Sequence, residues 1–211
     1  MWSRPACRCA GFSPDRHSVT GYGRVGGCRA FSDSRLRVEF TGSDGGCCRG
    51  PFGELWSTPF EQVAPVRSFP SFRGQVSFPG LYYAATMDAH VGFESWLERD
   101  VAMMLDFDPA VVAFSSLPFW LTWAQDGRQR RHAPDYFARL ADGTGVVIDV
   151  RPDDRIEPRD AEAFAATGRA CREVGWLFRR TAGPGAVLAA NVRWLAGYRT
   201  GGVTAVISPR C

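Results

Sequence analysis

The sequence contains no lysine, and all 25 of its basic residues are arginine. Arginine stays protonated in proteins, so chemistry that needs a lysine amine as a base or Schiff-base nucleophile is excluded. No run of about 18 apolar residues occurs, which argues against a membrane-spanning helix. The opening stretch MWSRPACRCAGFSP also lacks the apolar segment of a secretory signal. We therefore expect a cytoplasmic protein with no membrane partner.

A large excess of charge of one sign is also lacking. Residues 1–60 carry eight arginines and five acids, whereas residues 61–211 carry 17 of each. A domain with this balance does not bind nucleic acid through its net charge, so contact with DNA has to come from local arginine clusters.

The seven cysteines lack the spacing of a metal site. Five fall in the first 48 residues, as C-x-C, a single Cys28 and C-C, and only His17 lies nearby. Zinc sites typically use a C-x₂₋₄-C spacing, and disulfide frameworks belong to secreted chains. We expect reduced cysteines without a metal.

Three segments can be distinguished along the chain. Residues 1–62 are rich in Gly, Arg, Ser and Cys and show no sustained period, which predicts a disordered arm or translation from a start codon placed too far upstream. Residues 63–90 hold short aromatic runs broken by Pro and Gly, which predict an extended lead-in packed on the domain, with an edge hairpin as one form. Residues 91–211 are predicted to form the folded domain.

The periodicity of residues 91–211 predicts a mixed α/β (α+β) fold. The stretch GFESWLERDVAMMLDFDP has helical spacing and predicts a helix that ends before Pro109. Three β-rich runs follow: AVVAFSSLPFWLTWAQ, RHAPDYFARL and GVVIDVRP. A helix opened by Pro158, a short strand WLFRR, a last helix in AVLAANVRWLAGY and a terminal strand VTAVIS complete the order. The predicted core is αβββαβ, with helices flanking a small mixed sheet.

Asp149 lies inside the apolar strand VVIDVR. Because side chains alternate along a strand, Val147, Asp149 and Arg151 are expected on one face. A carboxylate in such a strand is costly unless it is paired or binds a metal. An ion pair with Arg151 or another arginine at the sheet edge is the ordinary structural explanation.

Two further acids have ordinary explanations when each is taken alone. Asp135 follows Pro134 at a strand entry and suits a solvated turn, while Glu98 on the first helix suits a surface ion pair, with Glu94 as a rival one turn earlier. Taken together with Asp149, they place hard oxygen ligands at one edge of a sheet. Such ligands suit Mg²⁺ or Mn²⁺.

At these residues the sequence resembles the PD-(D/E)xK nucleases, and more narrowly the TnsA-like endonuclease subunit of heteromeric transposases. The resemblance covers about residues 63–180 and rests on GFESWLERD, LDFDPAVVAF, SSLPFWLTW, HAPDYFARLADG, and VVIDVRP followed by the DAEAF helix. It implies a restriction-endonuclease-like αβββαβ core. It also implies an enzyme that cuts the 5′ strand at transposon ends beside a DDE-type recombinase, with an AAA+ ATPase as a further partner.

The resemblance makes Glu98, Asp135 and Asp149 the metal-binding acids, with Mg²⁺ as the cofactor and Mn²⁺ as its substitute. Arg151 falls where the nuclease lysine stands in the family pattern. Arginine keeps the positive charge and can hold a phosphate bidentately, but it cannot accept a proton. Its longer side chain can also fold back on Asp149 and block the site.

Two other functions remain open from the sequence. One is a catalytically weak or inactive nuclease-fold subunit that keeps its contacts with DNA or the transposase. The other is a stand-alone nuclease of restriction or repair type, which would cut DNA without a partner.

Basic residues flank the acids on both sides and suggest a path for a DNA backbone. We expect Trp120 and Trp123 to pack into the core rather than stack on bases. The residues predicted to contact DNA are Arg128, Arg130, Arg131, His132, Arg155 and Arg159. The alternative is a solvated arginine-rich turn with a histidine at a strand edge.

Overall fold

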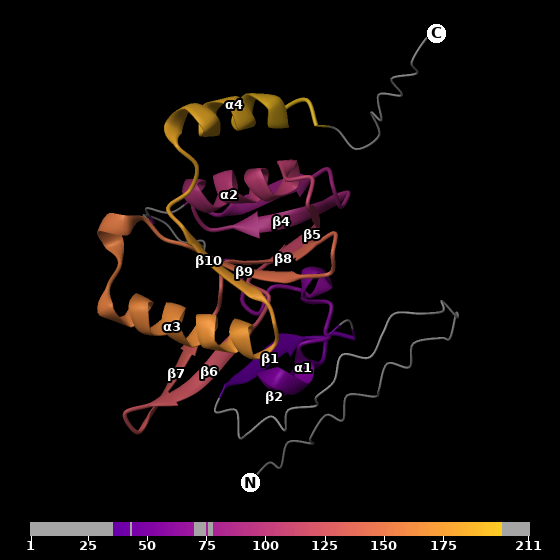
Figure 1. Ribbon diagram of the computed structural model, residues 1–211. Helices are drawn as coiled ribbons and strands as arrows, with labels where there is room; N and C mark the ends of the chain where they lie inside the picture. The colour runs from indigo at the N-terminus through magenta and orange to yellow at the C-terminus, as the bar shows by residue number, and fades with distance from the viewer. Residues whose placement is uncertain (1–35, 43, 70–74, 76–77, 200–211) are drawn as a thin grey trace.

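A computed structural model describes residues 36–42, 44–69, 75 and 78–199 of the chain (Figure 1). In these ranges the protein has a mixed α/β fold. Its elements are β1 (Arg37–Thr41), β2 (Cys47–Pro51), α1 (Phe52–Leu55), the 3₁₀ helix η1 (Phe60–Gln62), β3 (Gly80–Ala84), β4 (Ala89–Phe93), α2 (Trp96–Phe107), β5 (Val111–Ser116), β6 (Trp120–Gln125), β7 (Arg128–His132), β8 (Tyr136–Leu140), β9 (Gly145–Val150), the 3₁₀ helix η2 (Asp153–Arg155), α3 (Pro158–Glu173), β10 (Leu177–Thr181) and α4 (Ala186–Ala196).

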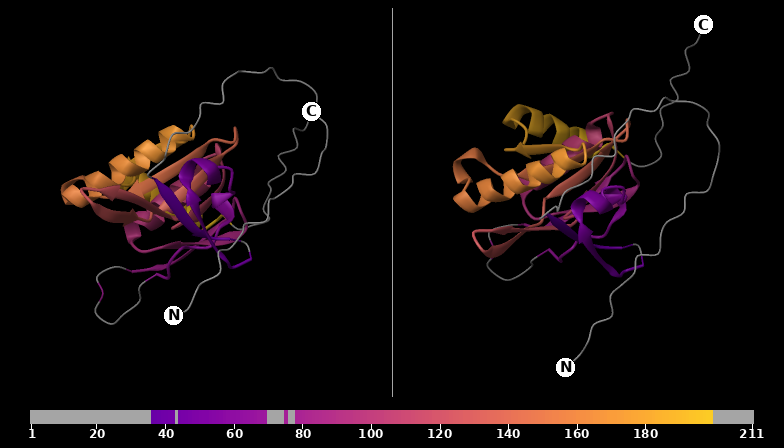
Figure 2. Two further views of the ribbon diagram at one scale, coloured as in Figure 1. Left: turned by 90° about the horizontal axis from the view of Figure 1, so that it is seen from below. Right: turned by 60° about the horizontal axis from the view of Figure 1, so that its bottom comes forward.

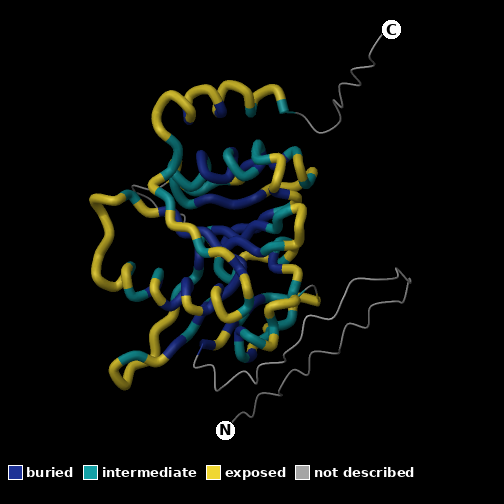
Figure 3. The backbone as a smooth tube through the Cα atoms, viewed as in Figure 1, coloured by how far each residue is buried: buried dark blue, intermediate teal, exposed yellow. Residues whose placement is uncertain are grey.

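The central sheet has the strand order β10-β9-β8-β5, with β10 parallel to β9 and the other neighbours antiparallel. All six residues of β9 are buried, and the strand lies deep in the molecule (Figure 3). Val147 packs into a core shared with α3, whereas Val146 and Ile148 pack into a core shared with α2. Helices α2 and α3 accordingly lie on opposite sides of the central sheet (Figures 1 and 2). The predicted alternation of faces in VVIDVR is therefore confirmed for Val146, Val147 and Ile148.

The second sheet, ordered β2-β1-β6-β7, corrects the prediction for the N-terminal segment. Residues 36–62 are not a disordered arm, because they form β1, β2, α1 and η1. Leu36, Val38 and Phe40 are buried at every second position, and Phe60 has no exposed surface. The alternation spans only five residues amid Gly, Ser and Arg, so composition concealed it. Residues 1–35 lie outside the described residues.

The run AVVAFSSLPFWLTWAQ forms two strands in two different sheets rather than one. Leu117 takes a positive φ of 46° and is followed by Pro118, so the chain leaves the central sheet after β5 and enters the second sheet at β6. A two-residue loop, Asp126–Gly127, with positive φ at both positions, then joins β6 to β7. The arginines of this region accordingly lie on β7, not in a turn as predicted.

The remaining elements follow the predictions more closely. β3 and β4 form a hairpin, which was one form considered for residues 63–90, although β4 continues to Phe93. As predicted, α2 ends before Pro109 and Pro158 is the first residue of α3. The predicted strand VTAVIS lies outside the described residues. Among the helices that are described, none has the length and apolar character needed to cross a bilayer.

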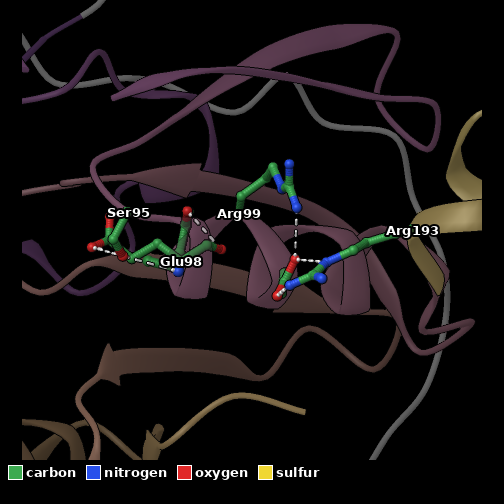
Figure 4. Close-up of polar contacts among 6 residues, drawn as sticks. Ser95, Glu98, Arg99 and Arg193 are labelled. Atoms are coloured by element: carbon green, nitrogen blue, oxygen red, sulfur yellow. Dashed lines mark hydrogen bonds and ion pairs between the residues drawn. The ribbon is translucent and has the colours of Figure 1, made fainter. Parts of the chain in front are cut away.

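Buried acids in the helical layer are held by specific partners. Asp100 on α2 is 5% exposed, and its carboxylate accepts hydrogen bonds from Arg99 and from Arg193 of α4 (Figure 4). Asp106, further along the same helix, accepts hydrogen bonds from the Tyr82 hydroxyl and the Thr86 amide, each at 2.8 Å. These two carboxylates, which lie away from the edge of the central sheet, are thus satisfied by the protein itself.

We predict that Phe60→Ala lowers the free energy of unfolding by about 3–5 kcal/mol, the usual cost of removing a buried Phe side chain. Phe60 makes edge-to-face ring contacts with Phe40 and Phe119, both at 5.0 Å between ring centroids. Trp56→Ala is the control, because Trp56 is 48% exposed. Urea denaturation monitored by circular dichroism gives both values. Equal, small losses in the two variants would mean that residues 36–62 are not part of the core.

Candidate active site

A cleft of about 290 Å³ lies beside the end of β9 and the start of β8, two inner strands of the central sheet, and is bounded by β7 and the start of α2. All four residues predicted to be catalytic line it. Of the six residues predicted to bind DNA, two line it and four do not. The predicted residues in its wall are Glu98, Asp135, Asp149, Arg151, Arg131 and His132.

Glu98 reaches the cleft from the first turn of α2. Ser95 is the N-cap and accepts a hydrogen bond from the Glu98 amide, while its hydroxyl donates to Glu98 Oε1 at 2.8 Å (Figure 4). Glu98 Oε2 accepts a hydrogen bond from the Glu94 amide at 2.7 Å. Burial raises the pKa of Glu98, and these two hydrogen bonds to its carboxylate oppose that rise. The side chain is therefore both a helix-capping group and a cleft acid.

Asp135 lies between β7 and β8, directly beside β9. Its Oδ2 accepts a hydrogen bond from the Val150 amide at 2.6 Å, which fixes the carboxylate against the end of β9. Burial raises the pKa of Asp135 well above its ordinary value, and the charges of Asp149 and Glu98 raise it further. The Val150 amide and Arg151 act in the opposite direction. Asp135 is thus close enough to each of the other two acids to be repelled by it.

Asp149 has one satisfied and one unsatisfied oxygen. Its Oδ1 lies 2.8 Å from Nε2 of His132, at the end of β7, so this contact joins the two sheets. Its Oδ2 is buried without a hydrogen-bond partner among the described residues. Within the same part of the chain, the ordinary alternative to a metal site, an ion pair of Asp149 with Arg151 or another arginine, does not form. Asp149, only 2% exposed, differs in this respect from Asp100 and Asp106.

Arg151 follows β9 and is exposed. Its guanidinium lies 3.4 Å from Asp160, the first-turn acid of α3, and its backbone amide donates to the Thr181 carbonyl. The side chain therefore does not fold back on Asp149. It remains on the rim of the cleft, where an anionic ligand can reach it.

The alternation of β7 divides the arginines predicted to contact DNA. His132 and Arg130 share one face of β7, and Arg130 lies 3.8 Å from Glu162 on α3. Arg131 points to the other face, with its guanidinium 4.4 Å from the centre of the Trp120 ring. Trp123 is buried as predicted, but Trp120, three residues earlier on the strand, lies on the opposite, open face.

Three other predicted DNA contacts lie away from the cleft. Arg128 is exposed at the start of β7, Arg155 is exposed at the end of η2, and Arg159 pairs with Glu157 at 2.9 Å on the exposed start of α3. None of the three lines the cleft. These three arginines are close to the cleft acids in the sequence but not in the folded structure.

Sequence reasoning missed several side chains in the wall of the cleft. Arg67 comes from the loop before β3 and makes a bidentate ion pair with Glu94, and its charge opposes the rise in the pKa of Glu98 that burial causes. Trp120 of β6 and Asp160 of α3 also line the cleft, together with Glu94, Ala133, Val150 and Phe164. The DAE stretch after Pro158 marked Asp160 as a helix-start acid, but no sequence spacing signals a contact made by a loop residue such as Arg67.

The donor set fits a hard divalent cation, although the side chains do not already surround one. The buried Asp149 Oδ2, which has no partner among the described residues, and the repulsion of Asp135 by Asp149 and Glu98 are features that a bound cation relieves. Among the described residues, no three His, Cys, Asp or Glu side chains are placed as a ready group for a metal ion. Binding would therefore require the side chains to move from their present contacts.

The comparisons add no relative. No protein-family model matches the chain, and a search of curated proteins finds no match. Function has to be inferred from the residues of the cleft.

Asp135→Asn is expected to raise the thermal stability at neutral pH. A raised pKa means that the folded state binds a proton more tightly than the unfolded chain, so the ionised Asp135 destabilises the fold above its folded pKa. The penalty shrinks as the pH falls through that raised value and vanishes below the ordinary aspartate pKa of about 4. Asparagine keeps an oxygen to accept from the Val150 amide.

Thermal melts of wild type and Asp135→Asn from neutral pH to about pH 4 test this. The difference in Tm should be positive at neutral pH and disappear in acid. Glu54→Gln is the matched control, since it removes one exposed carboxylate on α1 without touching the cleft. A less stable Asp135→Asn at neutral pH would contradict the inferred repulsion.

Proposed function

We propose that this protein is a metal-dependent DNA endonuclease, and more narrowly a TnsA-like subunit of a heteromeric transposase. The observation that carries the proposal is the convergence of Glu98, Asp135 and Asp149 on one cleft, with a buried and unpartnered oxygen on Asp149. The buried carboxylates of Asp100 and Asp106 are instead satisfied by arginine or tyrosine. An unsatisfied carboxylate beside two others is what a site for a divalent cation requires.

The topology supports the finer assignment. Leaving out the β6–β7 hairpin, the elements α2, β5, β8, β9, α3 and β10 follow one another in the order αβββαβ, with β5, β8, β9 and β10 in one sheet. This order agrees with a restriction-endonuclease-like core. The hairpin is then an insertion between the first and second core strands, and it supplies His132 to the site.

Each cleft residue has a distinct role in this proposal. Glu98, Asp135 and Asp149 hold Mg²⁺ or Mn²⁺, which when bound supplies a Lewis acid for the phosphodiester and its attacking water. His132 orients Asp149 through Oδ1. Arg151 leaves Asp160 and holds a phosphate oxygen, a contact that its planar guanidinium suits. In the transposase setting the partners are transposon-end DNA, a DDE-type recombinase that processes the 3′ strand, and an AAA+ ATPase.

A catalytically weak or inactive subunit is the second candidate. Two contacts favour it: His132 occupies Asp149 Oδ1, and Asp160 holds Arg151 on the rim. If these contacts persist in the presence of metal and DNA, the cleft keeps its shape but not its chemistry.

We predict that wild type binds Mn²⁺ through the cleft acids. Isothermal titration calorimetry should show binding by wild type and by Glu54→Gln, and no measurable binding by Asp135→Ala. The Asp135→Ala change removes one of the hard ligands of the site. Circular dichroism provides the folding control for each variant. Equal Mn²⁺ binding by wild type and Asp135→Ala would remove Asp135 from the site.

We also predict that wild type nicks DNA in Mg²⁺ or Mn²⁺ when its recombinase partner is present. Asp135→Ala should abolish nicking. Arg151→Ala should reduce the rate about 10²-fold, the usual effect of removing one group that stabilises charge in the transition state, while Arg151→Lys retains activity because it keeps the charge. Nicking without the recombinase would favour a stand-alone nuclease. Metal binding with no nicking under any condition would favour the inactive subunit.

A further inference from the structure

The sheet β2-β1-β6-β7 has one buried face and one open face. Val38 and Leu121 point into the core, so the residues next to them on β1 and β6 point outward. The strand register aligns Arg37 of β1 with Thr122 of β6, and Thr122 with Arg131 of β7. A row of polar and basic side chains therefore crosses three strands on the open face.

This row forms the floor of a groove of about 400 Å³ that adjoins the cleft. Trp120 and Arg131 line both the groove and the cleft, so the two hollows share a wall. Gln129 adds a further polar side chain at the β7 side. A ligand lying along the groove is thereby led to the three acids.

The groove carries positive charge from arginines that do not pair with an acid in the described part of the chain. Arg49 and Glu39 form an ion pair and neutralise each other. No acid in the described part of the chain lies within ion-pair distance of the guanidinium of Arg37 or Arg131. Arg131 instead lies over the Trp120 ring. Because adjacent strands are about 4.8 Å apart, Arg37 and Arg131 are separated by about 10 Å across the sheet.

We propose that this open face of the second sheet binds the phosphate backbone of a DNA strand and guides it from β1 into the cleft. The inference rests on the proposed function for the identity of the ligand as DNA. Arg37 and Arg131 contact successive parts of the backbone, and the half-exposed Trp120 provides an aromatic surface for a base near the entry to the cleft. In this proposal β1 is part of the substrate-binding surface as well as of the core.

The test is DNA binding as a function of salt, measured by fluorescence anisotropy. The probes are a labelled strand of about 20 nucleotides, a length chosen to exceed a typical single-strand site, and the duplex of the same sequence. Both are used in EDTA so that no cutting occurs. The variants are Arg37→Gln/Arg131→Gln, its charge-retaining counterpart Arg37→Lys/Arg131→Lys, and Arg169→Gln. Arg169 is the matched control because it is exposed on α3, which packs on the buried side of this sheet.

The double glutamine variant should bind about tenfold more weakly at about 100 mM salt. Its slope of log affinity against log salt should fall by about two, because two arginines no longer neutralise phosphates. The double lysine variant should keep the slope, and Arg169→Gln should match wild type. Thermal melts confirm that the variants are folded. The loss of affinity in the double glutamine variant can be equal for the two probes or larger for the single strand. A larger loss for the single strand indicates base stacking on Trp120. Either result supports the proposed surface.

Unchanged affinity and slope in the double glutamine variant would overturn the proposal, as would failure of wild type to bind either DNA. The nicking assay separates this result from the proposed function. If wild type nicks DNA but the glutamine variant binds it normally, the nuclease stands and the surface is wrong. If the glutamine variant no longer binds DNA while wild type neither binds Mn²⁺ nor nicks, the surface stands and the nuclease is wrong.

Discussion

The structure depends on one constraint: β9 is buried on both faces and carries a carboxylate. A strand of six buried residues needs a packed layer on each side, which α2 and the β3–β4 hairpin supply on one side and α3 and the second sheet on the other. Asp149 is only 2% exposed in this position, so its carboxylate has to be satisfied by protein groups, by a cation or by both. His132 satisfies one oxygen from the neighbouring sheet. The site is therefore a product of the way in which the two sheets meet.

The carboxylates of the cleft are less well satisfied than the other buried acids of this fold. Asp100 and Asp106 show how this fold satisfies a buried acid, through arginine, tyrosine and backbone amides. In the cleft, the pKa of Asp135 is raised by burial and by neighbouring acids, while Arg67 and Arg151 pair with Glu94 and Asp160 instead. Clusters of this kind are tolerated where function requires them.

The sequence alone was sufficient for the helices around Glu98 and Pro158, the strand around Asp149, and the acids that share the cleft. The helices and the strand follow from local periods of 3.6 and 2 and from strand alternation, whereas the grouping of the acids came from the resemblance to the PD-(D/E)xK pattern. It was insufficient for Phe60 and for the alternation from Leu36 to Phe40, because these side chains pack mainly against residues that are distant in the sequence. The sequence also did not show that Trp120 and Trp123 lie on opposite faces. That conclusion requires both residues to belong to one continuous strand, because three steps along a strand reverse the face.

Two of the cleft acids differ in what the fold itself gains from them. Glu98 caps α2, so the fold itself gains from this side chain independently of any role in the cleft. Asp135 gives the fold a repelling charge that asparagine would avoid. Drift would consequently erase Asp135 long before Glu98. Among diverged copies of such a chain, the residue at position 135 would therefore report on the function that we propose for the cleft, whereas an acid at position 98 records only the survival of a helix.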